Sequence, residues 1–459
     1  MHRDLRSWIA ELEAAGELLR VRKPVDPRTQ MGALLYESRE RGLLFEDIVG
    51  HPGWRVLGQA PANLRHAALA FDTDLQGLIP CVAQLMDRRI PPRLVPDGPV
   101  QEVIQPGDQV NLLEIPAHVA GALDAGPFIA SGLAVTRDPD TGCRNVSFHR
   151  LQIKGRNRTG ALLVPRHTFR NFQKYETKGL PMPIAFFIGH HPLYYMAAAT
   201  TGPYGMDELE IAGGFLGEPV SLVKCQTVDL EVPADAEIVI EGHVLPGVRE
   251  QEGPFSEFHD YYVAGSGENP VIEYSAITRR HDAIYKAIQN GSEVEGCVFH
   301  KVPMAAALFR RVQNVGGFVD LKNVRVMPGI LGVVVQMTPR FHGEARQVLM
   351  AALAGEYLHQ KIAIAVDDDV DIYSDWEILW SLTTRVDPER DITIIPGVRG
   401  HPMDPTGVEF FHTGQVGWQR LGSKVLIDAT RPPTSDPERE VFTRIKPPGF
   451  GQVRLADFL

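Results

Sequence analysis

Apolar positions near the start of the chain follow first a helical spacing and then strand-like runs. The helical pattern comprises Leu5, Trp8, Ile9, Leu12 and Leu19. These residues predict a short helix, which Asp4 caps. Residues 31–41 repeat the helical spacing, while residues 20–24, 43–45 and 54–57 read as extended segments. This alternation predicts an N-terminal α/β domain over residues 1–110.

From residue 132 to about 278, turn residues separate a series of short apolar runs. Asp138-Pro139-Asp140-Thr141-Gly142 is typical of a turn between two strands. We expect strands at residues 133–136, 145–153, 161–164, 184–188, 220–223, 238–240 and 271–274, and a helix at 168–175. The proline-rich residues 91–116 predict an extended connection before this region. The pattern indicates a hairpin-rich sheet or barrel over residues 111–300.

Helical and strand-like patterns alternate again in the last part of the chain. Residues 304–312 and 345–353 have helical spacing, and residues 333–336 and 362–366 are apolar runs. Asp367, Asp368 and Asp369 follow the last run, and we interpret them as solvated residues at a strand end. A second α/β domain is therefore expected over residues 301–459, and the fold class is mixed α/β (α+β).

Composition narrows the function classes. The 459 residues include 46 Lys and Arg and 57 Asp and Glu, so the formal net charge is −11. This balance argues against broad binding to nucleic acid or anionic membranes, and no stretch approaches the ~18 apolar residues of a membrane span. The four cysteines form no CxxC pair, which disfavours a zinc knuckle or a disulfide framework. We expect a cytoplasmic protein that binds neither nucleic acid nor membrane.

Two glutamates flank the segment Glu252-Gly253-Pro254-Phe255-Ser256-Glu257. A spacing of five places them on opposite faces of a strand, and about 140° apart on a helix. An irregular turn at Gly253 and Pro254 could instead direct both into one cavity, where one carboxyl would retain its proton and act as an acid. The alternative is a polar loop with two exposed glutamates.

Three further stretches carry candidate chemistry. Asn145-Val-Ser-Phe-His-Arg150 reads as a strand, and Arg150 on its apolar face needs an anionic partner unless it reaches solvent at a sheet edge. Arg166-His167 opens the expected helix, where backbone N–H groups favour an anion. Glu208 could be an oxygen ligand of a cation. The order of Gly213-Gly214 fits neither a Rossmann motif nor a P-loop.

Together these stretches resemble the UbiD family of decarboxylases over nearly the whole chain. The segments that carry the resemblance are Asp4-Leu5-Arg6-Ser7-Trp8, Asn145 through Arg150, Arg166-His167, Glu208 ahead of Ala212-Gly213, Leu222-Val223-Lys224-Cys225, Glu252 through Glu257, and Asp367 through Asp371 before Trp380. The resemblance implies an N-terminal α/β segment, a split-β-barrel-like domain that binds prenylated FMN, and a C-terminal α/β oligomerisation domain.

The resemblance also implies the roles of individual residues. Asn145, His167 and Glu208 would bind a divalent metal, commonly Mn²⁺, at the phosphate of prenylated FMN, with a monovalent ion such as K⁺ nearby. Arg150, Glu252 and Glu257 would form the catalytic network, in which Glu257 donates the proton. Residues expected to contact the cofactor are Asn145, Ser147, Phe148, His149, Arg150, Arg166, His167 and Glu208. Because strict alternation separates Asn145 from Arg150, we expect a bulge or strong twist near Ser147.

The activity implied is the reversible, non-oxidative decarboxylation of an α,β-unsaturated or (hetero)aromatic carboxylic acid. Our preferred substrate is a furan- or pyrrole-type acid, and His300, Arg310 or Arg311 could meet a second carboxylate if these residues are not merely exposed. Ser256 and His259 could tune substrate choice. A flavin prenyltransferase would supply the cofactor, and the enzyme would be a homodimer or higher homo-oligomer.

Two alternatives remain open from the sequence. An FMN-dependent reductase or flavin-binding protein on a split barrel would use ordinary FMN and release no CO₂. A metal-dependent hydrolase would use Asn145, His167 and Glu208 without a flavin.

Overall fold

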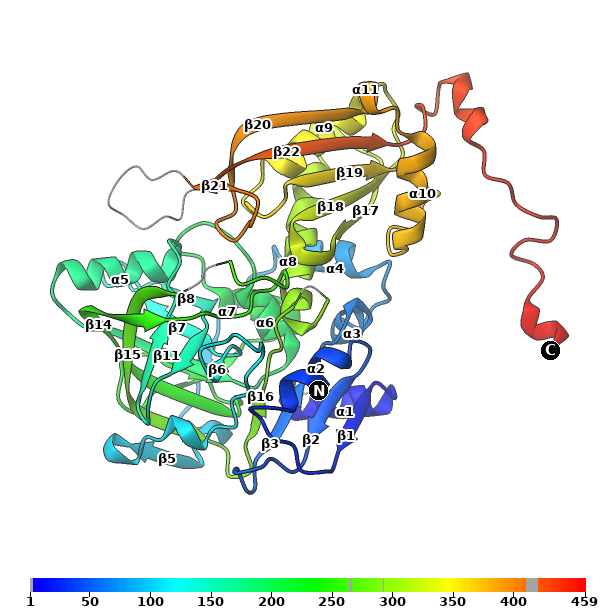
Figure 1. The fold of residues 1–459 in the computed structure, drawn as a ribbon. Coiled ribbons are helices and arrows are strands. Elements are labelled where there is room, and N and C mark those ends of the chain that lie inside the picture. The colour runs from blue at the N-terminus through cyan, green and yellow to red at the C-terminus, as the bar shows by residue number, and fades with distance from the viewer. Residues whose placement is uncertain (1–2, 264–265, 292, 410–419) are drawn as a thin grey trace.

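The computed structural model describes residues 3–263, 266–291, 293–409 and 420–459. Figure 1 shows three regions: a small sheet with helices near the N-terminus, a curled sheet that forms half a barrel, and a C-terminal sheet flanked by helices. The fold is therefore mixed α/β, as the sequence predicts. The predicted domain limits at residues 110 and 300 stay predictions.

The N-terminal region is built on a four-stranded sheet of order β1-β2-β3-β16. Asp4 begins α1 through a capping box, in which its carboxylate accepts from the N–H groups of Arg6 and Ser7 at 3.0 and 2.9 Å. Leu19, which we expected in the helical pattern, belongs to β1 instead and is 42% exposed. The elements are α1 (Leu5–Ala14), β1 (Leu18–Val21), α2 (Met31–Glu37), β2 (Gly42–Phe45), β3 (Arg55–Gly58), α3 (Leu64–Ala70), α4 (Leu78–Leu85) and β16 (Ile284–Lys286).

The central sheet has the order β6-β9-β10-β15-β14-β11-β7-β8, with β5 added beside β15. Its long hairpin has a register shift after Glu241, where β14 approaches β15 so closely that a Cβ on Gly242 would lie 2.1 Å from the Glu273 carbonyl oxygen. Its strands are β5 (Val103–Pro106), β6 (Phe128–Ile129), β7 (Leu133–Arg137), β8 (Arg144–Phe148), β9 (Leu151–Ile153), β10 (Arg158–Ala161), β11 (Met182–Ile188), β14 (Ile238–Glu252) and β15 (Gly267–Arg279).

Helices and a small sheet of order β13-β12-β4 cover this central sheet. These elements are β4 (Arg93–Leu94), α5 (His167–Thr177), α6 (Pro192–Ala198), α7 (Glu208–Leu216), β12 (Ser221–Lys224) and β13 (Glu231–Pro233), with single-turn helices η1 (Pro99–Gln101), η2 (Gly107–Gln109) and η3 (Leu112–Glu114). Residues 91–116 are thus not a plain connection, because β4 and β5 each pair within a sheet.

Two of the expected central strands are wrong in detail. Residues 145–153 form two strands, β8 and β9, because β8 pairs with β7 whereas β9 pairs with β10 and β6. The expected strand at residues 161–164 lies three residues earlier, as β10, where Thr159 and Gly160 pair with both β9 and β15. The change of pairing partner, which the pattern of one strand cannot show, divides residues 145–153.

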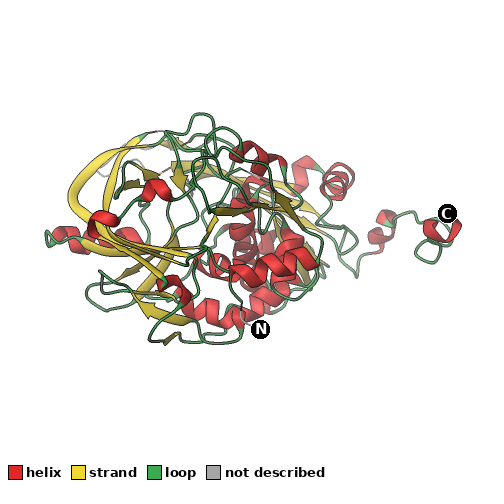
Figure 2. Ribbon diagram, turned by 90° about the horizontal axis from the view of Figure 1, so that it is seen from below, coloured by secondary structure: helices red, strands yellow, loops and turns green. Residues whose placement is uncertain are grey.

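The C-terminal region is a sheet of order β17-β18-β19-β22-β20, with β21 beside β22. The elements are α8 (Glu295–Val312), η4 (Val315–Gly317), β17 (Leu321–Val326), η5 (Pro328–Ile330), β18 (Gly332–Met337), α9 (Glu344–Leu353), β19 (Ile362–Val366), α10 (Asp375–Arg385), α11 (Pro388–Asp391), β20 (Ile392–Gly400), β21 (Val408–Glu409), β22 (Arg420–Ala429), η6 (Pro437–Phe442) and η7 (Leu455–Phe458). In Figures 1 and 2 the last residues extend away from the body. No helix in the described ranges is long and apolar enough to cross a membrane.

Candidate active site

Arg150 lies in the two-residue gap between β8 and β9. β8 pairs with β7 without interruption from Arg144 to Phe148. This pair of strands therefore has no bulge near Ser147, where we expected one. The chain instead changes its partner strand across His149 and Arg150. The strand-like alternation of side chains therefore does not extend to Arg150. Arg150 and Asn145 can thus belong to one site, although strict alternation would separate them.

Arg150 joins both candidate glutamates. Its Nε and Nη2 donate to the two carboxylate oxygens of Glu252 at 2.9 Å each, and its Nη1 donates to Glu257 Oε1 at 2.5 Å. All three side chains are buried. Asn269 on β15 donates a further hydrogen bond to Glu252 at 2.9 Å, and the Arg150 guanidinium lies 4.8 Å from the centre of the Phe255 ring. The prediction that an irregular turn brings the two carboxyls together is confirmed. The alternative, a polar loop with two exposed glutamates, is wrong.

The two glutamates come together because Glu252 belongs to a strand whereas Glu257 belongs to the irregular segment that follows it. Glu252 is the last residue of β14, and the chain then leaves the sheet through Gly253, whose φ of +87° is a conformation that glycine adopts easily. Burial raises the pKa of Glu257 to about 7, with Glu252 and Asp124 adding to the rise and Arg150 opposing it. Glu257 thus holds its proton to near neutral pH and can serve as a general acid.

Behind Arg150, polar side chains line one face of β8. Asn145 Nδ2 donates to Ser147 Oγ at 3.2 Å, and Ser147 Oγ lies 3.1 Å from His149 Nε2. Thr168 on α5 contacts both Asn145 and Ser147 at 3.0 and 2.8 Å. The predicted shared face of Asn145, Ser147 and His149 is confirmed. Burial lowers the pKa of His149 to about 4, so its ring is neutral.

The proposed metal ligands begin two helices that point at this face. His167 is the first residue of α5, next to Thr168, and Glu208 is the first residue of α7. The Val146 N–H donates to Glu208 Oε2 at 2.6 Å, which places this carboxylate beside the backbone of Asn145. The fold therefore gathers the elements carrying Asn145, His167 and Glu208, although their use as ligands stays a prediction.

The chemistry of these donors fits a cation. Glu208 is 4% exposed and forms no ion pair with any described residue, and burial raises its pKa to about 8. A divalent cation would return the carboxyl to its ionised form. Burial and the nearby Arg166 and Arg170 lower the pKa of His167, which leaves the neutral imidazole that a metal requires. Arg166 donates to Thr201 Oγ1 at 3.2 Å and pairs with no acidic residue in the described ranges, so it can meet a phosphate.

Comparison with known proteins agrees with this arrangement. Three family models match in succession: the 3-octaprenyl-4-hydroxybenzoate carboxy-lyase N-terminal domain at residues 9–86, its Rift-related domain at 93–293 and its C-terminal domain at 297–429. The chain belongs to the UbiD family of carboxy-lyases. It is an enzyme of this class, as the sequence resemblance indicates.

Relatives and solved structures extend over most of the chain. It is 36% identical over 340 residues to an anhydromevalonate phosphate decarboxylase of Methanothermobacter thermautotrophicus, covering 73% of this chain and 76% of the relative. It is 30% identical over 473 residues to a phenolic acid decarboxylase of Sedimentibacter hydroxybenzoicus, covering 98% and 95%. The UbiD-class enzyme HmfF of Pelotomaculum thermopropionicum, solved in complex with FMN, matches with a TM-score of 0.91 and 38% identity, covering 99% of this chain and all of that one.

Aromatic rings surround the remaining predicted UbiD cofactor residue, Phe148. Its ring centre lies 5.3 Å from that of His300, 5.8 Å from Tyr195 and 6.1 Å from Phe299. Arg310 and Arg311 lie elsewhere, because they pair with Asp87 and Glu356 at the surface. Of the three basic residues considered for a second carboxylate, only His300 lies beside this aromatic group.

Ser256 and His259 have structural partners in this UbiD enzyme. Ser256 donates to Asp124 through its backbone N–H at 2.6 Å and its hydroxyl at 3.2 Å. His259 Nε2 lies 2.8 Å from the Met403 carbonyl oxygen in the C-terminal region. Their effect on substrate choice stays a prediction. Sequence reasoning missed Asp124 and Asn269, since no motif marks either position.

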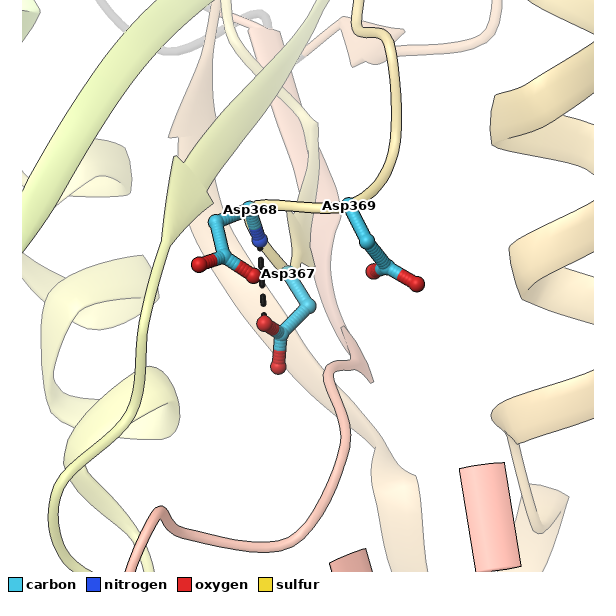
Figure 3. A group of neighbouring side chains, drawn as sticks. All are labelled: Asp367, Asp368 and Asp369. Atoms are coloured by element: carbon cyan, nitrogen blue, oxygen red, sulfur yellow. Dashed lines mark hydrogen bonds between the residues drawn. The ribbon is translucent and has the colours of Figure 1, made fainter. Parts of the chain in front are cut away.

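The acidic run after β19 is not a set of solvated residues at a strand end, as we interpreted it from the sequence. Asp367 is fully buried and binds Arg431 and Arg439, each at 2.7 Å. Figure 3 shows that the Asp367 carboxylate accepts a hydrogen bond from the N–H of Asp368. One carboxylate oxygen of each of the three residues lies within 4.8 Å of the others. Asp369 binds Arg385 at 2.7 Å. The three carboxylates are thus held by arginines, and they attach the C-terminal segment to the sheet.

Proposed function

We propose that this enzyme decarboxylates a furan- or pyrrole-type aromatic acid with prenylated FMN, Mn²⁺ and a nearby K⁺. The buried contact of Arg150 with both Glu252 and Glu257 supports the proposal, because a cation that could bind a carboxylate lies beside a carboxyl that could donate a proton. HmfF in its complex with FMN, and a dimeric form of HmfF in complex with prenylated FMN, support the choice of cofactor. The rings around Phe148 suit a small flat acid.

Each catalytic side chain has one task in this proposal. Arg150 Nη1, the donor that faces Glu257, binds the substrate carboxylate, while Nε and Nη2 remain with Glu252. The C–C bond to the carboxylate breaks, CO₂ leaves, and the electron pair stays on the ring carbon. Prenylated FMN, when bound, supplies the electron sink for that pair. Glu257 then gives its proton to the same carbon, and solvent restores the proton to Glu257.

The cofactor would lie along the polar face of β8. Asn145, His167 and Glu208 would hold Mn²⁺ at the phosphate, and Arg166 would contact the same dianion. Ser147 and His149 would line the flavin from this face, and Phe148, the last residue of β8, would contact it where the strand ends. We further propose a cytoplasmic homodimer or higher homo-oligomer, supplied by a separate flavin prenyltransferase.

Native mass spectrometry with an absorbance spectrum tests the cofactor. The protein is co-expressed with a flavin prenyltransferase and supplied with Mn²⁺. A bound mass of prenylated FMN is expected. Plain FMN bound to a protein that releases no CO₂ would favour the reductase alternative, and a loaded metal without flavin would favour a hydrolase.

A substrate panel tests the reaction. CO₂ release is measured with furan-2-carboxylate, furan-2,5-dicarboxylate and pyrrole-2-carboxylate, and with cinnamate and 4-hydroxybenzoate as competing classes. The loaded Glu257→Gln variant is the matched control, since it keeps the size of the side chain and removes the acid. Release from the furan or pyrrole acids alone supports the proposal, whereas release only from the other two acids contradicts it.

A further inference from the structure

Residues 121–125 form a segment that packs against the loop of Glu257. The segment borders a cavity of about 650 Å³ between α2 and residues 119–122. A Cβ on Gly121 would lie 2.3 Å from the hydroxyl oxygen of Tyr262 and 2.9 Å from Ser256 Cβ. A side chain at residue 121 would therefore displace Tyr262 or Ser256, which shows that the segment and the loop pack closely against each other.

Asp124 is the main polar link between the two. Its carboxylate accepts from the Ser256 N–H at 2.6 Å, from the Ser256 hydroxyl at 3.2 Å and from the Gly121 N–H at 2.8 Å. All three partners are donors, and their hydrogen bonds oppose the rise in pKa that desolvation causes at the half-buried Asp124 carboxyl. Asp124 therefore holds the residue immediately before Glu257 from two directions.

Two further contacts join the same segments. The Ala125 N–H donates to the Pro254 carbonyl oxygen at 2.9 Å. Gln152 on β9 bridges the pair, since its amide oxygen accepts from the Gly253 N–H at 3.1 Å and its amide nitrogen donates to the Ala125 carbonyl at 3.3 Å. The turn from Gly253 to Ser256 is thus fixed at both ends.

We propose that Asp124 is a positioning residue for decarboxylation, which fixes the loop that carries Glu257 and places a second negative charge near its carboxyl. The inference rests on the proposed role of Glu257 as the proton donor.

The charges around Glu257 make this effect measurable. Arg150 faces it from the gap between β8 and β9, Glu252 from the end of β14 and Asp124 from the segment, while the Asp260 N–H donates to the Glu257 carbonyl oxygen within the loop. Glu252 and Asp124 both raise the pKa of Glu257, and Arg150 lowers it. Removing the charge of Asp124 is therefore expected to lower the pKa of Glu257.

Infrared titration of Asp124→Asn tests the charge without any substrate. The variant keeps an oxygen that can accept from the Ser256 N–H. The carbonyl band of protonated Glu257 is identified by its loss in Glu257→Gln, and its midpoint should fall by about one pH unit in Asp124→Asn. Asp229→Asn is the control, because Asp229 has a side chain 96% exposed and should leave the midpoint unchanged. An unchanged midpoint in Asp124→Asn overturns the charge effect.

Turnover tests the positioning. Ser256→Ala keeps every carboxylate and loses one hydrogen bond to Asp124, so kcat should fall several-fold at constant KM, and Asp124→Glu should recover part of the loss seen in Asp124→Asn. Unchanged kcat in both Ser256→Ala and Asp124→Asn overturns the positioning role, and Ser256→Ala alone decides it if Asp124→Asn does not fold. If Glu257→Gln retains turnover, the proposed proton donor is wrong, yet the infrared midpoint still decides how Asp124 acts on Glu257.

Discussion

The basic limb of the pH profile should report the ionisation of Glu257. Burial raises its pKa from 4.5 to about 7. This shift corresponds to about 3 kcal/mol and increases the protonated fraction at pH 7 from about 0.3% to about one half. Because the proposed proton donor acts in its acid form, activity should be present below pH 7 and be lost as the pH rises. kcat/KM should fall to about one tenth of its plateau at pH 8 and to about one hundredth at pH 9.

The assay follows CO₂ release by enzyme saturated with Mn²⁺, with flavin occupancy checked by absorbance at each pH. This check separates the limb of Glu257 from loss of cofactor, since burial also raises the pKa of Glu208. The substrate carboxyl is ionised throughout the range. A profile that stays level to pH 9, or that already falls near pH 5, would refute the reasoning that burial sets the acid form of Glu257.

Three further predictions follow from the contacts. Glu208→Ala should lose metal and flavin together in elemental analysis and absorbance, and full flavin occupancy would remove Glu208 from the metal set. Asp4→Ala removes a capping box and an ion pair to Arg280, and should lower the free energy of unfolding by about 1–2 kcal/mol in a urea titration, with Asp229→Ala, whose side chain is 96% exposed, as the control. Lys286→Met leaves the fully buried Glu295 without its cation and should lower the free energy of unfolding by about 3–5 kcal/mol in the same titration. A decrease below about 1 kcal/mol would show that Glu295 does not depend on Lys286.

Local chemistry predicted much of the fold. The capping residue Asp4 and the apolar run of β19 each depend on interactions within a few residues, and the expected strand at 362–366 has the bounds Ile362–Val366. The break between β8 and β9 depends instead on which strands lie alongside, and the burial of Asp367 depends on Arg431 and Arg439, more than sixty residues later. Spacing within the chain does not contain this information.

In the candidate site, too, the features that depend on nearby residues were predictable and those that depend on distant residues were not. The pair Glu252 and Glu257 was recognisable because glycine and proline between them predict an irregular turn. Their common partner Arg150 could only be proposed, since it is more than one hundred residues away in the chain. Asp124 carries no sequence signal, because its role depends on packing against the Ser256 backbone.

The strand β16 has a consequence for how the chain must be synthesised. β16 lies at residues 284–286, yet it completes the sheet formed by residues 18–58 through its parallel pairing with β3. On the ribosome, β3 therefore remains an open edge until nearly 290 residues have emerged, and such an edge can pair with other nascent chains. A fragment ending at residue 110 should accordingly aggregate, whereas adding β16 as a separate peptide should improve its solubility.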